Sequence, residues 1–149
     1  MTMSLFSVLE TSGSALAAER ARAEIVAANL ANAETTHTAD GGPFRRKMVV
    51  FAGTGASAFR LLLAGYNRLA GRPAGSVRLV NVVEDSTPPV VRYEPGHPDA
   101  NASGFVAYPN INPIQEMVDL MGAVRAYQLN ASAVTAAKQM IQQSLDILK

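Results

Sequence analysis

Apolar residues in the last third of the chain recur at alternating intervals of three and four positions. The stripe that they form runs through Met117, Leu120, Val124, Tyr127, Ala131, Val134, Lys138, Ile141, Leu145 and Leu148. This is a heptad pattern, which places one narrow face of a helix against a partner helix. Asn112 can cap the helix, and Pro113 suits its first position. The pattern therefore predicts a single helix over residues 113–148.

This predicted helix is long for a chain of this size. At ~1.5 Å per residue it would extend about 54 Å. A compact chain of 149 residues has an expected radius of gyration of only about 15 Å. The helix would therefore reach beyond a compact globule, and its apolar stripe needs a partner outside the chain's own core.

The N-terminal segment carries a second, weaker stripe with the same spacing. It consists of Leu5, Leu9, Ser12, Leu16, Glu19, Ala23, Val26 and Leu30, in a segment rich in alanine, which is a strong helix former. Ser7 and Glu10 have the spacing of a capping box, but the stripe already begins at Leu5, so the start of this helix stays open between the two. Two arrangements remain open: the two helices pair as an antiparallel hairpin, or the helical tails become ordered only on assembly.

Between the two helices the pattern changes to short apolar runs bounded by glycine and proline, which is typical of strands and turns. The predicted strands cover residues 44–51, 77–83, 90–93 and 104–108, and residues 52–75 are predicted to form a long loop. The fold class is therefore α+β: long N- and C-terminal helices form a coiled-coil-like stem, with a small antiparallel β-rich insert between them. The expected division is an N-terminal assembly helix and its following turn (1–39), the β-rich insert (40–111) and the C-terminal coiled-coil helix (112–149).

Composition argues against several classes of function. The net charge is +1 and charged residues make up 17% of the chain, so the sequence offers no basic surface for nucleic acid. The single basic run, Arg45-Arg46-Lys47, is interpreted as the solvated end of a strand. No window approaches the ~20 apolar residues of a membrane span. The run Ala15-Leu16-Ala17 resembles a cleavage site but lacks the basic and apolar segments of a signal peptide.

The chain offers little catalytic chemistry. It has no cysteine, and its histidines are His37 and His97. Glu94, His97 and Asp99 are close in sequence, but the intervening glycine and prolines give no helical spacing for metal ligands. Ser103 adds a further catalytic residue type, yet a triad is defined by its geometry. We therefore expect no enzyme activity, no metal and no cofactor, and we expect His97 to pack or cap within a turn.

Two groups of residues carry a resemblance to a known family. Asn29-Leu30-Ala31-Asn32, followed by Thr35, is similar to the N-x-A-N…T signature of flagellar rod and hook proteins. The second group is more specific and resembles the proximal rod proteins of the bacterial flagellar basal body. It comprises Tyr93–Ala100, Gly104–Val106, Tyr108–Asn112, Glu116–Met121, Arg125–Gln128 and Asn130. Two departures are residues 53–75, which are longer and more apolar than this family usually carries, and Leu129, where alanine is more usual.

The resemblance implies a structural subunit of the flagellar basal-body rod, required for flagellum-dependent motility. Such a subunit polymerises helically through its terminal helices and forms the proximal part of the periplasm-spanning drive shaft. It is exported by the flagellar type III apparatus without a cleaved signal peptide. Its partners would be further copies of itself, other rod proteins, the export apparatus and basal-body components. Two alternatives stay open: another axial rod or hook component, and a small self-associating binding module.

The heptad pattern and the resemblance together assign an expected assembly interface to both helices. Its residues are Leu9, Leu16, Val26, Asn29, Leu30, Asn32, Met117, Leu120, Val124, Arg125, Tyr127, Asn130, Val134, Ile141 and Leu145. Asn29 and Asn32 would set the register through hydrogen bonds to neighbouring subunits, or would belong to the region that ends the N-terminal helix. Glu116 would likewise join contacts between subunits or lie as an exposed helix charge.

Overall fold

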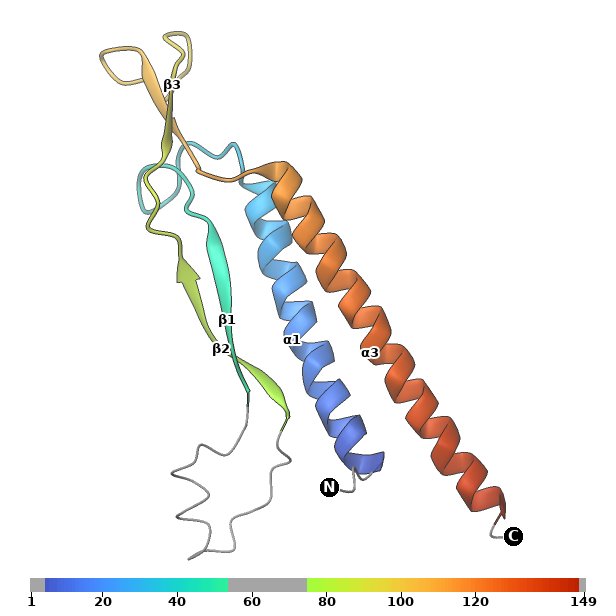
Figure 1. The fold of residues 1–149 in the computed structure, drawn as a ribbon. Coiled ribbons are helices and arrows are strands. Elements are labelled where there is room, and N and C mark those ends of the chain that lie inside the picture. Colours follow the sequence, from blue (N-terminus) through green and yellow to red (C-terminus); the bar gives the residue numbers. More distant parts are fainter. Residues whose placement is uncertain (1–4, 54–74, 148–149) are drawn as a thin grey trace, which may run out of the picture. The chain divides into compact units, whose positions relative to one another are not determined.

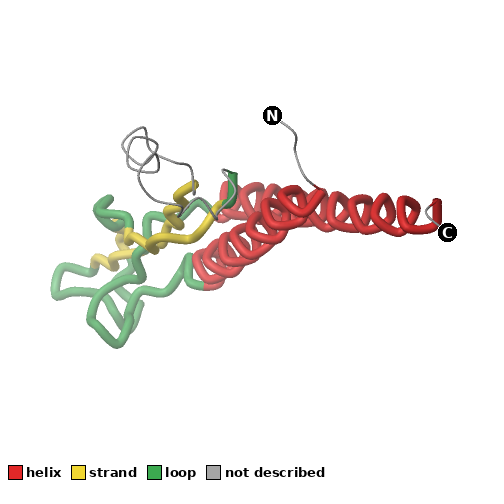
Figure 2. The backbone as a smooth tube through the Cα atoms, turned by 90° about the horizontal axis from the view of Figure 1, so that it is seen from below, coloured by secondary structure: helices red, strands yellow, loops and turns green. Residues whose placement is uncertain are grey.

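The computed structural model describes residues 5–53 and 75–147, and it confirms the α+β class. In chain order its elements are α1 Leu5–Ala31, β1 Lys47–Gly53, β2 Val77–Glu84, β3 Val90–Tyr93, β4 Phe105–Tyr108 and α3 Pro113–Ile147 (Figure 1). Figure 2 shows the same division of the chain into helices, strands and loops. Most of the loop predicted over residues 52–75 lies outside the described residues, and Ala52 and Gly53 belong to β1 instead.

The helix α3 begins where the sequence predicts. The side-chain oxygen Oδ1 of Asn112 accepts a hydrogen bond from the amide of Ile114 at 3.0 Å. Pro113 occupies the first helical position, where its missing N–H has no helical partner to lose. The predicted last residue of this helix, Leu148, lies outside the described residues.

The helix α1 begins at Leu5, the first residue of the apolar stripe, so of the two starts left open by the sequence the capping box at Ser7 is not the one adopted. Ser7 lies inside the first turn and is not the residue that precedes the helix. At the other end, the Asn32 side chain donates from Nδ2 to the carbonyl of Ala28 at 2.9 Å. Its Oδ1 accepts a hydrogen bond from the hydroxyl of Thr35 at 3.1 Å. Asn32 thus connects the last turn of α1 to the turn that follows it.

The strands form two separate two-stranded sheets, β1 with β2 and β3 with β4. β1 starts later than predicted because the amide of Phe44 donates to the carbonyl of Thr35 at 3.0 Å, which holds Phe44 in the preceding loop. β3 and β4 are antiparallel, and Val90 lies opposite Tyr108. β4 starts one residue later than predicted because Gly104 has a φ of 78°, a left-handed conformation that belongs to a turn rather than to a strand.

The chain divides into two compact units. Unit 1 contains residues 1–21, 51–80 and 123–149, and unit 2 contains residues 22–50 and 81–122. Among the described residues, the buried apolar side chains of unit 1 are Ala18, Ala123 and Ala137, and those of unit 2 are Val26 and Val106. In the described part of unit 1, the buried apolar side chains are thus all alanines, small residues that let backbones approach closely.

The buried line of α3 differs from the predicted stripe by one position in several turns. Glu116, Ala123 and Ala137 are buried, whereas the predicted Met117, Val124 and Lys138 are exposed. The other stripe members divide: Leu120, Ala131, Val134 and Ile141 are half-buried, and Tyr127 and Leu145 are exposed. Small residues and one carboxylate fill the covered face, so the larger side chains lie on an exposed flank of the same helix.

Candidate assembly interface

A polar cluster inside unit 2 contains two of the most deeply buried side chains of the described residues. Asn29 of α1 and Glu116 of α3 are each only 1% exposed. Burial of polar groups at this depth is costly unless each donor and acceptor has a partner. The stability of this cluster therefore depends on whether each of its donors and acceptors has a partner.

The carboxamide of Asn29 has partners on both its nitrogen and its oxygen. Nδ2 donates to the backbone carbonyl of Lys47 at 2.8 Å and to Oε2 of Glu116 at 3.1 Å. Oδ1 accepts a hydrogen bond from the backbone amide of Lys47 at 2.8 Å. Within the single chain, these bonds join the last turns of α1 to the first residue of β1 and to the first turn of α3.

Charged side chains surround this carboxamide in alternating sign. Nε of Arg46 donates to Oε1 of Glu116 at 2.7 Å, and Nη2 of Arg46 lies 3.8 Å from Oδ2 of Asp119. The other carboxylate oxygen of Asp119 lies 3.5 Å from Nη2 of Arg22. Two arginines therefore face two carboxylates, so the network is neutral as a whole and each buried charge has an opposite partner.

Two sequence interpretations need correction here. Arg46 is not the solvated end of a strand, because its side chain is only 26% exposed and its guanidinium binds the buried carboxylate. Glu116 is not an exposed helix charge. Its spacing from Leu120 and Ala123 places it on the covered face of α3, and this spacing is the sequence signal that could have located it. No comparable signal indicates Arg46, since its partner is 70 positions away.

The other expected interface residues with polar side chains make local bonds or lie exposed. Nδ2 of Asn130 donates to the carbonyl of Ala126 one turn earlier at 2.9 Å. Arg125 and Tyr127 are exposed on α3. Contacts of Asn29, Asn32 and these residues with neighbouring subunits stay predictions.

On α1, the expected interface residues lie at or near the covered side. Val26 is buried, and Leu9, Leu16 and Leu30 are half-buried. The exposed positions of this helix carry small or charged residues instead, with Phe6 as the exception. Most residues of the predicted α1 stripe are thus at least partly covered by the chain itself.

The N-terminal part of α3 exposes a group of large apolar side chains. Ile114 is 72% exposed, Val118 52% and Met121 64%, and Met117 beside them is 48% exposed. Positions 114, 118 and 121 follow a helical spacing of four and three residues, so they share one face. A contiguous exposed apolar face of this kind is typical of surfaces that bind a partner.

The β3–β4 hairpin has one packed and one open face. Val106 is buried on the packed face, where the hydroxyl of Tyr108 donates to Oε2 of Glu94 at 2.8 Å and this bond raises the pKa of the phenol. On the open face, the exposed rings of Tyr93 and Phe105 meet edge to face, with centroids 5.2 Å apart. The aromatic pair supports the short hairpin from the solvent side.

His97 has a local structural role, as the sequence predicts. Its Nδ1 accepts a hydrogen bond from the amide of Asp99 at 3.1 Å, and its ring lies 6.1 Å from that of Tyr108. The carboxylate of Asp99 accepts from the hydroxyl of Thr36 at 2.6 Å, and His97 Nδ1 accepts a bond here, whereas the Nδ1 of a triad histidine donates to its carboxylate. Among the described residues, no group of three histidine, aspartate or glutamate side chains is arranged to hold a metal ion.

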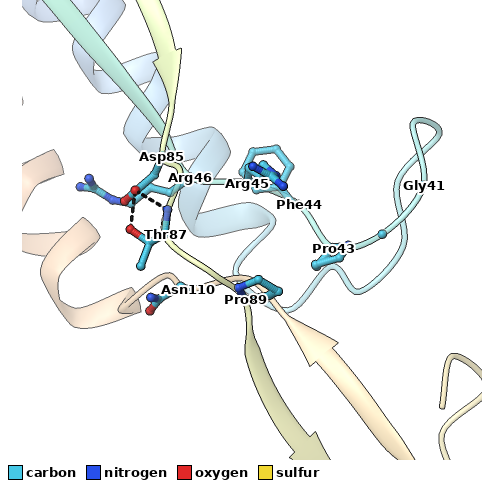
Figure 3. A pocket seen from close by; sticks show the side chains of 10 residues that line it. Gly41, Pro43, Phe44, Arg45, Arg46, Asp85, Thr87, Pro89 and Asn110 are labelled. Carbon is cyan, nitrogen blue, oxygen red and sulfur yellow. Dashed lines mark hydrogen bonds between the residues drawn. The ribbon is translucent and has the colours of Figure 1, made fainter. Parts of the chain in front are cut away.

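A shallow hollow lies beside the loop that precedes β1 (Figure 3). Phe44, Pro43 and Pro89 line it together with Asp85, whose carboxylate accepts hydrogen bonds from the amide and the hydroxyl of Thr87. These two bonds lower the pKa of Asp85. The hollow holds about 180 Å³, less than the ~300–1,000 Å³ of typical small-molecule sites. It gives no ground for a cofactor site.

Two family comparisons define the class of this protein. Residues 9–36 match the family described as "Flagella basal body rod protein", and residues 102–147 match "Flagellar basal body rod FlgEFG protein C-terminal". The first match contains α1 from Leu9 onward, and the second contains β4 and α3. None of the helices in the described part of the chain is long and apolar enough to cross a membrane.

Relatives of known identity align with the chain from end to end. The flagellar basal-body rod protein FlgC of Bacillus subtilis (strain 168) is 38% identical over 99% of this chain and 100% of its own length. FlgC of Salmonella typhimurium is 37% identical over 97% of this chain and 98% of its own length. FlgC of Borreliella burgdorferi is 34% identical over 99% of both. The chain belongs to the FlgC family of flagellar basal-body rod proteins.

Proposed function

We propose that this protein is a structural subunit of the flagellar basal-body rod and polymerises helically through α1 and α3 into the proximal part of the drive shaft. The end-to-end similarity carries the proposal. Three relatives named as rod proteins align with 97% to 99% of this chain. The role is structural rather than catalytic.

The surface of α3 supports assembly through the helices. Its exposed apolar side chains are larger than the alanines of its covered face. In the rod, Ile114, Met117, Val118 and Met121 would pack against neighbouring subunits. Complete burial of a fully exposed side chain of this kind stabilises by about 1.5–3 kcal/mol, and these residues, 48% to 72% exposed, would gain the corresponding part of it. Assembly would then add to the fold the apolar burial that the single chain lacks.

The route to the rod and its partners complete the proposal. The protein passes through the flagellar type III export apparatus without a cleaved signal peptide. It then contacts further copies of itself, other rod proteins and basal-body components. The basis for this part is membership in the rod protein family.

Deletion and complementation test the function directly. Cells without the gene should carry no filaments and should not swim, because rod growth stops at the inner membrane. Expression of the intact chain should restore both. Complete rods in the deleted strain would assign the chain to another axial component, and normal swimming would remove it from the flagellum altogether.

The helical interface is tested by two substitutions on α3. Val134 is half-buried, and Ser132 is exposed two positions away. Val134→Asp would place a carboxylate in the predicted contact, where burial of an unpaired charge is strongly unfavourable. Ser132→Asp should be much milder. If the exported Val134→Asp protein supports swimming as well as the unmodified protein does, the predicted register is wrong.

A further inference from the structure

Lys47 is the first residue of β1. On the edge of this strand that faces away from β2, a side chain bonds to both backbone groups of Lys47. The carbonyl of Arg46 accepts a hydrogen bond from the amide of Asp85, directly after β2, at 2.7 Å. Polar groups of successive strand residues point to alternate edges. The N–H and C=O of Lys47 therefore point away from β2, and both bond to the carboxamide of Asn29 at 2.8 Å. One side chain thus supplies the pair of bonds that a neighbouring strand would supply.

The orientation of this carboxamide is fixed by the buried carboxylate. The second N–H of Asn29 Nδ2 bonds to Oε2 of Glu116, whose Oε1 is held by Nε of Arg46. Arg46 and Lys47 are consecutive residues, so the four residues form a closed ring of bonds. Rotation of the carboxamide by 180° would point its oxygen at two acceptors, the Lys47 carbonyl and the Glu116 carboxylate. Only one orientation satisfies every partner.

We propose that Asn29, Arg46, Lys47 and Glu116 form a latch that positions the start of β1 and closes this edge to strands of other chains. An open strand edge is a template for pairing with another chain. A fully satisfied buried network is rigid, whereas a partly satisfied one is not. Resting on the proposed function, the inference adds that the subunit enters the rod only with the latch closed.

A donor–acceptor exchange tests the central bond of the latch. Asn29→Asp replaces Nδ2 by an oxygen that faces Oε2 of Glu116, and Glu116→Gln replaces Oε2 by a nitrogen that faces Nδ2 of Asn29. In the double variant the new nitrogen donates to the new oxygen, the bond to Arg46 is kept, and the net charge equals that of the unmodified protein. Aspartate at position 29 has no donor for the Lys47 carbonyl, so the double variant should recover only the part of each loss that the bond between positions 29 and 116 carries.

Hydrogen exchange of the purified full-length chain measures the effect. Each single substitution should speed exchange across β1 about tenfold, since a buried group has lost its partner. The double variant should exchange across β1 about threefold more slowly than Asn29→Asp, yet faster than the unmodified protein, because the Lys47 carbonyl still lacks its donor. Asn32→Asp is the matched control, because it adds the same charge at the end of α1 while Asn32 bonds only locally. It should leave β1 exchange unchanged.

Several results would overturn the latch. Additive effects in the double variant would show that Asn29 and Glu116 do not act through each other. That conclusion would hold even if both single variants unfold completely. Faster β1 exchange in Asn32→Asp would assign the effect to charge alone. Light scattering should detect association of the single variants, and strictly monomeric single variants would refute closure of the edge.

The same variants, expressed in the strain without the gene, separate the latch from the proposed function. The double variant should restore swimming better than Asn29→Asp does, since it regains the bond between positions 29 and 116. Single variants that swim normally despite fast β1 exchange would refute the requirement for a closed latch and leave the rod function intact. Failure of the unmodified chain to restore swimming would refute the rod function, while the exchange results would still decide the latch.

Discussion

Two adjacent arginines provide the sharpest contrast between this structure and the sequence pattern. Arg45 is exposed, whereas Arg46 donates at 2.7 Å to a carboxylate that is 1% exposed. Alanine at position 46 removes the charge partner of Glu116 and leaves its Oε1 without that donor. Alanine at position 45 removes a side chain from solvent. The same substitution at neighbouring positions therefore separates a buried ion pair from a surface charge.

The expected magnitude follows from burial. Removing one partner of a buried ion pair costs roughly 3–5 kcal/mol. The side chain of Arg46 is 26% exposed, so water entering the vacated space should reduce this cost to about 2–4 kcal/mol. The longer contact of Arg46 with Asp119 adds less than about 1 kcal/mol. Arg45→Ala should stay within about 0.5 kcal/mol.

Urea unfolding of the two variants is the assay. With a slope of about 2 kcal/mol per molar, Arg46→Ala should lower the midpoint by roughly 1–2 M and Arg45→Ala should hardly move it. The loss in Arg46→Ala should persist at high salt, since buried pairs are screened much less than exposed ones. Equal midpoints for the two variants, or a loss that salt abolishes, would refute the buried pair.

Three further outcomes are expected. Gly104→Ala should destabilise the β3–β4 hairpin, because φ at Gly104 is 78° and the new Cβ would lie 2.9 Å from the ring of Tyr93. The new Cβ of Gly96→Ala would meet no atom within 4 Å, so a comparison of the urea midpoints of the two variants checks this prediction. Ala137→Leu should cost about 1–3 kcal/mol through overpacking of a buried position, and calorimetry should find the adjacent, exposed Ala136→Leu nearly neutral. The hydrogen bond that raises the pKa of the Tyr108 phenol contributes stability that is present below pH ~10 and lost as pH rises through the raised pKa. Tyr108→Phe should therefore make stability less steeply dependent on pH in that range, and an unchanged pH profile would contradict this assignment.

The sequence predicted the parts of this fold that depend on local chemistry. The cap at Asn112 and the proline after it fix the start of α3, and both act on residues within one turn. The strand Val90–Tyr93 is bounded by prolines, which end a strand wherever it packs. The family membership was also available from the sequence, since the motif around Asn29 and the stretch from Tyr93 to Asn130 resemble rod proteins. Local propensity and motif therefore gave the elements and the class.

Tertiary structure alone decided which face of each helix is covered and what Asn29 binds. A heptad pattern selects the largest apolar residues, but α3 covers Ala123 and Ala137 and exposes Met117 and Val124. A heptad pattern is identified from large apolar residues, and it takes no account of the closer backbone approach that small residues allow. The link from Arg46 to Glu116 spans 70 positions, and no local pattern relates two charges at that separation. Such a pair forms only when the folded chain brings both groups out of water together, because only there does each charge need the other.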